Sequence, residues 1–189
     1  MANVFKTGLM ASNQLDTMLA SAIVRDANDA EIEVKDGSLV VLGDLADDTT
    51  YSTFSASLPA VDYNTYYATA PAAATDEVLI VDYAGISEGE IAGNYYREGI
   101  KLYDLVAPAG TIVRARRLAL HDKFWLGADN FASAPTVGKF AAATANAFTH
   151  TPAATLPAAG YAIKILAAED LTAGMATKGK IYLVEVVQL

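Results

Sequence analysis

The sequence predicts a mainly β protein: one or two small antiparallel β-barrel or sandwich domains behind an N-terminal arm or short helix. Three observations predict this class. Short apolar runs such as 77–83 stand between turn-forming residues, as strands do. The alanine-rich connectors at 141–147 and 151–159 are interleaved with Thr, Pro and Asn, which disfavours helix. Hydrophobic residues make up 53% of the 189, enough for a packed core and against disorder.

Residues 1–27 form the first predicted unit, and two interpretations stay open for it. Apolar residues recur at helical spacing after Ser12, a possible N-cap, so Asn13 to Val24 could form a short amphipathic helix. An extended arm is the alternative. Phe5, Leu9 and Met10 have no evident partner in the sequence. They therefore either cover the chain's own core or dock on a neighbouring molecule.

Residues 28–106 are predicted to form an acidic, tyrosine-rich β domain. Residues 31–35 alternate between polar and apolar side chains, Asp36-Gly37 supplies a tight turn, and residues 38–42 are aliphatic, which together predict a β-hairpin. Residues 52–74 predict an irregular excursion with short strands. The run 77–83 is apolar on both faces, so we expect a strand that is buried on both sides.

Residues 107–189 are predicted to form a C-terminal β-barrel or sandwich domain. The turn at 107–110 leads into a strand over 111–120, in which Arg114 and Arg116 share one face with three aliphatic residues. Further strands are expected at 137–141, 160–167 and 180–187. The only tryptophan, Trp125, is expected to fill the core of this domain.

The net charge of −9 is divided unevenly along the chain. Residues 1–96 hold 3 Lys or Arg against 15 Asp or Glu, whereas residues 97–189 hold 10 against 7. An acidic protein repels phosphate at long range, which disfavours general binding to nucleic acid. The asymmetry fits either a solvated surface or opposite patches that orient docking between protein subunits.

The residues offer little for catalysis or for metal binding. The chain has no cysteine, which excludes disulfides, thiolate nucleophiles and cysteine-bound metals. His121 and His150 do not fall in a ligand-spaced motif. The acidic loop at 43–48 lacks EF-hand spacing, and residues 85–89 do not match a nucleophile elbow. We therefore expect no enzyme activity, no cofactor and no metal, and no apolar run approaches the ~20 residues of a membrane span.

Several segments carry a resemblance to a known family. They are the stretch 123–141 with the only tryptophan, the motif Gly93-Asn-Tyr-Tyr-Arg97, the turn 107–110 leading into 112–117, the final strand 181–187, and a weaker echo at 36–43. Over roughly residues 93–189 the chain resembles the small capsid decoration, or auxiliary head, proteins of tailed bacteriophages. The resemblance implies a structural virion protein, made in the host cytoplasm, that binds the outer surface of the head. Its implied partners are the major capsid protein and copies of itself, with a trimer favoured, and no nucleic acid or membrane.

Residue types then indicate which side chains would form contacts between subunits. The candidates are Phe5, Leu9, Met10, Tyr66, Tyr67, Tyr95, Tyr96, Arg114, Arg116 and Arg117. Tyrosine and arginine are enriched at protein interfaces, since each combines a large contact area with a polar group. Two alternatives remain: a virion-surface module whose tyrosines bind a host glycan, and a tail component of the same particle.

Overall fold

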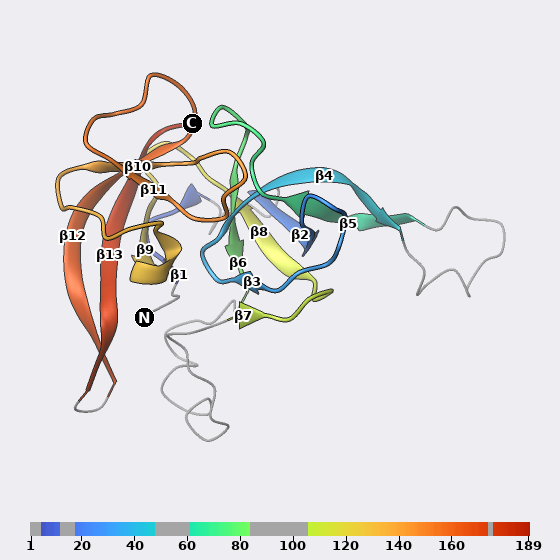
Figure 1. Ribbon diagram of the computed structural model, residues 1–189, viewed down its shortest axis with the longest axis horizontal. Coiled ribbons are helices and arrows are strands. Elements are labelled where there is room, and N and C mark those ends of the chain that lie inside the picture. The colour runs from blue at the N-terminus through green and yellow to red at the C-terminus, as the bar shows by residue number, and fades with distance from the viewer. Residues whose placement is uncertain (1–4, 12–17, 48–60, 84–105, 174–175) are drawn as a thin grey trace.

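The computed structural model describes residues 5–11, 18–47, 61–83, 106–173 and 176–189, with the backbone alone for 47, 61–64, 172–173 and 176–178. Within these ranges the protein is mainly β, as predicted, and the strands form a closed barrel, a six-stranded sheet and a small two-stranded sheet (Figure 1). The helical turn η5 covers Ala128–Asn130.

Five strands close the barrel, in the order β2-β5-β4-β6-β8. Their bounds are Leu19–Val24 for β2, Leu39–Asp47 for β4, Val61–Thr69 for β5, Leu79–Asp82 for β6 and Val113–Arg117 for β8. The pair β2-β5 is parallel and the other pairs are antiparallel. Small buried side chains such as Ala22, Val81 and Ala115 fill the interior, because a barrel of few strands is narrow.

The six-stranded sheet is antiparallel and follows the order β1-β9-β13-β12-β10-β11. Its strands are β1 (Phe5–Thr7), β9 (Lys123–Gly127), β10 (Phe140–Ala142), β11 (Thr151–Ala153), β12 (Ala162–Ala173) and β13 (Ala176–Gln188). Its inner face packs on the outer side of the barrel. Leu39 and Ile80 of the barrel share one buried cluster with Phe124 of β9, which joins the two sheets through a common core.

The two sheets divide the chain at a different place from the predicted boundary at 106/107. Strand β8 still belongs to the barrel, and the change to the six-stranded sheet lies between Arg117 and Lys123. The N-terminal strand β1 also crosses over and pairs with β9, placing Phe5 opposite Leu126. Residues from both ends of the chain therefore build the larger sheet.

Two local predictions about secondary structure need correction. Residues 19–24 are strand β2, so a helix over 13–24 is wrong for that part, and 12–17 lie outside the described residues. The turn at Asp36-Gly37 is present, with Gly37 at φ 81°, but the strands around it do not pair with each other. Instead β3 (Val34–Lys35) pairs with the distant β7 (Val106–Ala107), while β4 joins the barrel. Pairing over such a distance leaves no local signal in the sequence.

Trp125 does not fill the core as predicted. Strand β9 alternates sides, so the fully buried Phe124 and Leu126 face the barrel while Trp125 points to the outer face, where it is partly exposed. Its cross-strand neighbours there are Lys6 and Leu183. The run Phe-Trp-Leu is apolar throughout, and the alternation could equally have placed the tryptophan inward.

A groove on the barrel as the candidate interaction site

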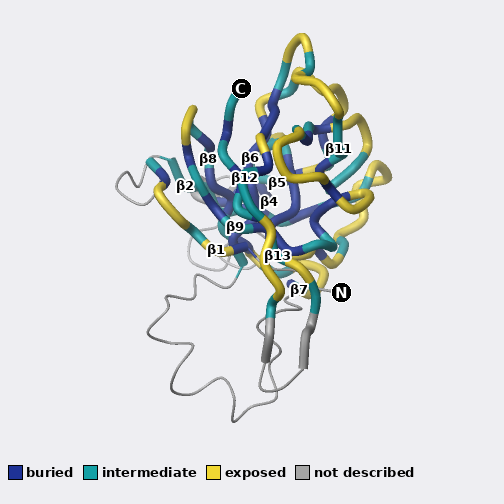
Figure 2. Tube along the Cα trace, turned by 90° about the vertical axis from the view of Figure 1, so that its left-hand side faces the viewer, coloured by how far each residue is buried: buried dark blue, intermediate teal, exposed yellow. Residues whose placement is uncertain are grey.

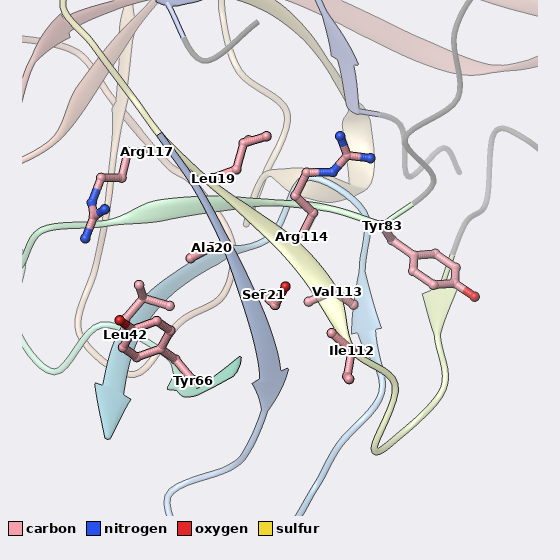
Figure 3. Close-up of a pocket in the computed structure, with 10 residues that line it drawn as sticks. All are labelled: Leu19, Ala20, Ser21, Leu42, Tyr66, Tyr83, Ile112, Val113, Arg114 and Arg117. Carbon is pink, nitrogen blue, oxygen red and sulfur yellow. The ribbon is translucent and has the colours of Figure 1, made fainter. Parts of the chain in front are cut away.

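An open groove of about 740 Å³ lies against the barrel and brings together several of the predicted interface residues (Figure 3). We call it the barrel groove. Its lining is Leu19, Ala20, Ser21, Leu42, Tyr66, Tyr83, Ile112, Val113, Arg114 and Arg117. These residues come mainly from β2 and β8, which pair antiparallel, with Leu42 from β4 and Tyr66 from β5. The groove therefore combines an apolar surface, two phenol rings and two guanidinium groups.

The three arginines of β8 have different environments. Arg116 is buried, with 8% of its side chain exposed, and its Nε lies 2.6 Å from Oδ2 of the equally buried Asp82. Arg114 is 40% exposed and lies 3.7 Å from the same carboxylate oxygen. Arg117 is 42% exposed, and its Nε donates to Oε1 of the exposed Glu77 at 3.2 Å. Arg116 thus has a structural role, whereas Arg114 and Arg117 are accessible to a partner.

Asp36 ties the barrel to the six-stranded sheet next to this ion pair. Its buried carboxylate accepts hydrogen bonds from the backbone N–H groups of Phe5, at 3.1 Å, and Tyr83, at 3.0 Å. Its carbonyl oxygen accepts a bond from the Asn130 side chain at 2.6 Å. Burial raises the pKa of Asp36 to about 7, and the nearby Asp82 acts in the same direction. The junction therefore fixes Tyr83, a lining residue of the barrel groove, through its backbone.

The ten residues predicted to form contacts between subunits do not share one environment in the structure. Tyr66, Arg114 and Arg117 line the barrel groove. Tyr67, on the next position of β5, instead lies under Arg25, whose guanidinium carbon is 3.2 Å from the ring centroid. Arg116 is buried beside Asp82, away from the exposed surface of the strand. Tyr95 and Tyr96 lie outside the described residues.

The three N-terminal candidates also differ. Phe5 and Met10 are buried in the chain's own core, which fits the interpretation of a local cover. Phe5 packs on Phe124 with the ring centroids 5.4 Å apart. Leu9 is 74% exposed, and its carbonyl accepts a hydrogen bond from the Lys123 backbone at 2.8 Å. Only Leu9 of these three remains available to another molecule.

Several lining residues were not singled out from the sequence. Among them are Leu19, Ser21 and Tyr83. For the two residues of β2, Leu19 and Ser21, the sequence gives no local sign of a groove, since β2 pairs with strands about 45 and 95 positions away. Ile112 is 56% exposed. An aliphatic residue beside two arginines was visible in the sequence, but its exposure depends on where the strand ends.

The two histidines lie away from the barrel groove. His121 is exposed, and its Nδ1 lies 2.9 Å from Oε1 of Glu185; this contact lowers the pKa of Glu185. His150 is fully buried against Phe131 and Tyr161, and burial lowers its pKa to about 3. Within the ranges that the structure covers, no group of three His, Cys, Asp or Glu side chains is placed to hold a metal ion. No helix in those ranges is long and apolar enough to cross a membrane.

Comparison with known proteins gives no relative for this chain. No family model matches it, and no match is found among curated proteins or solved structures.

Proposed function

We propose that this protein is a structural virion protein that binds the outer surface of a phage head and stabilises contacts between major capsid subunits. The observation that carries the proposal is the barrel groove, whose lining includes Tyr66, Tyr83, Arg114 and Arg117 together with the exposed Ile112. Tyrosine and arginine are enriched at protein interfaces and among the residues that contribute most of their binding energy. The motifs at 93–97, 107–117, 123–141 and 181–187 supply the likeness to decoration proteins.

The mechanism would consist of surface burial. A standard interface between two proteins buries about 1,600 Å², and one such contact has a modest affinity that depends on its central residues. On a shell the same contact is repeated many times, and linked copies bind with a much higher effective concentration than single ones. In this proposal the barrel groove joins neighbouring subunits of the outer layer, and the oligomer as a whole holds the shell.

Adding the purified chain back to heads that lack it tests this function. We expect saturable binding to the heads and release of DNA at a higher temperature than from bare heads. A Tyr66→Ala, Ile112→Ala double variant should bind the heads at least tenfold more weakly, because it removes apolar contacts between copies, which then no longer bind the shell as a linked set. Val137→Ala is the matched control, since Val137 is exposed but does not line the barrel groove.

Two outcomes would contradict the proposal. Heads that gain neither bound protein nor heat resistance would exclude the decoration role. Saturable binding to host-surface glycans, lost in the Tyr66→Ala variant while heads bind nothing, would favour the glycan-binding alternative. A tail component would bind tails and leave the heads bare.

A further inference from the structure

The hairpin of β12 and β13 extends beyond the sheet that it belongs to (Figures 1 and 2). The two strands pair with each other from Ala162 to the end of the hairpin. Their other neighbours are much shorter: β10 pairs with β12 only as far as Lys164, and β9 pairs with β13 only from Ile181 onward. We call residues 167–173 and 176–180 the arm. Along it, neither outer edge has a strand partner among the residues whose placement is known.

Within the described chain, the arm lacks strand partners along its outer edges. An isolated two-stranded ribbon is marginally stable in water, and its unpaired N–H and C=O groups can bind another chain. The base of the arm is firmly held, because Ile165, Tyr182 and Val184 lie in the buried core. The arm is therefore presented in a fixed direction, with its edges and one face open to a partner.

The described side chains give the arm a specific chemistry. Glu169 is exposed and pairs across the hairpin with Ile181, while Leu171 is the next residue on the same face. That face thus carries a carboxylate between apolar groups. On the opposite face Asp170 lies 3.5 Å from Lys180, so this second acid already has a cation beside it. Glu169 makes no ion pair within the described part of the chain.

The barrel groove is the complement of this face. It offers the apolar side chain of Leu19 between Arg114 and Arg117, and that of Ile112 beyond Val113 at the other end (Figure 3). Both arginines are partly exposed, and Glu77, an ion partner of Arg117, is itself mostly exposed. Exposed pairs of that kind are worth little, so an incoming carboxylate can join or replace Glu77 at small cost.

We propose that the arm of one copy occupies the barrel groove of a second copy, with Glu169 facing Arg117. The arm belongs to the six-stranded sheet and lies apart from the barrel of its own chain in Figure 1, so the contact is between molecules. Two different surfaces meet in it, and such a contact closes into a ring or continues as a chain. The inference names the partner of the groove and rests on the proposed role of the groove as a contact between subunits.

Charge reversal tests this contact in the full-length chain. Arg117→Glu is preferred to Arg114→Glu, because a carboxylate at 114 would repel the buried Asp82. Glu169→Lys is its counterpart on the arm. Sedimentation and light scattering of the purified protein should show an assembly for the natural sequence. The concentration below which the assembly dissociates should be at least about tenfold higher for each single variant than for the natural sequence, because like charges then meet in the contact.

The double variant Arg117→Glu, Glu169→Lys restores opposite charges and should assemble within a few-fold of the natural chain. Mixing the two single variants should also restore one kind of contact between unlike chains. Glu33→Lys makes the same charge change at an exposed site outside both surfaces and should assemble normally. Thermal unfolding of every variant confirms that each is folded.

Two results would overturn the inference. One is a natural chain that stays monomeric at every concentration. The other is a double variant that assembles no better than the folded single variants. Either result, together with saturable binding of the natural chain to heads, would reject the arm contact and leave the decoration role in place. Assembly with the expected charge dependence, but without binding to heads, would support the arm contact and reject the decoration role.

Discussion

The barrel interior and the core between the barrel and the six-stranded sheet are filled by different kinds of side chain. Apart from Leu79, the buried residues of the barrel cluster are alanines and valines. The core between the sheets instead holds Phe124, Phe131, Tyr161 and Tyr182 together with long aliphatic residues. A narrow barrel leaves room only for small groups, whereas packed sheets stand ~10 Å apart and need large ones. Each region is therefore vulnerable to the opposite kind of substitution.

The two cores also position different surface elements. The small barrel residues hold β8 close to β2 and β6, which places Arg114 and Arg117 at the groove. The aromatic core holds the inner halves of β12 and β13, from which the arm extends. One region thus builds a receiving surface and the other builds the element that we infer to enter it.

Phe124→Ala is expected to give the largest effect. It removes a fully buried ring from the core between the sheets and should lower the free energy of unfolding by about 3 to 5 kcal/mol. The adjacent Trp125→Ala is the matched control, since its ring lies on the outer face and should cost less than half as much. Denaturant unfolding of both variants measures the difference. An equal loss for the two would show that Trp125 is a core residue.

Ala115→Leu should have the next largest effect, and by the opposite mechanism. Ala115 is fully buried inside the barrel, so a larger side chain has no space and should cost about 1 to 3 kcal/mol. Ala154→Leu, at an exposed position outside the barrel, should change stability little. If Ala115→Leu unfolds at the same denaturant concentration as Ala154→Leu, the barrel interior is not tightly packed.

The third expected effect is a change in how the free energy of unfolding depends on pH. The raised pKa of Asp36 means that its contribution is fully present below about pH 4 and is lost as the pH rises through about 7. The lowered pKa of His150 acts in the opposite sense: its contribution is present above about pH 6.5 and is lost as the pH falls toward 3. Between pH 4 and 6.5 the two slopes oppose each other.

Single substitutions should separate the two slopes. In Asp36→Asn only the contribution of His150 remains of these two. The free energy of unfolding should therefore rise with pH between 4 and 6.5, by at most about 1.4 kcal/mol per pH unit. In His150→Phe only the contribution of Asp36 remains, so the free energy of unfolding should fall as the pH rises over the same range. Unfolding free energies at four pH values give these slopes. Parallel curves for the two variants would contradict the assignment of opposite shifts.

Patterns within one strand were predictable from the sequence, and pairings between distant strands were not. The run 77–83 was expected to be buried on both faces, and β6 is fully buried. Arg114 and Arg116 were expected on one face of their strand, and both lie beside Asp82. The parallel neighbour of β2 is 44 positions away and the partner of β3 is 71 to 73 positions away, and the sequence carries no local signal for either pairing.

The barrel groove shows the same limit. Tyrosine and arginine could be selected by residue type, but type alone did not distinguish Tyr66 in the groove from Tyr67 under Arg25. Neighbouring residues of a strand face opposite sides, and only the closed barrel decides which side is which. The arm was invisible for a similar reason, because its exposure depends on the shortness of β9 and β10 and not on its own composition.

The number of copies in each particle tests the central functional claim most directly. Quantitative mass spectrometry of purified virions gives the ratio of this chain to the major capsid protein. The decoration role predicts hundreds of copies, released together with loss of heat resistance. A dozen copies or fewer, or none at all, would contradict it.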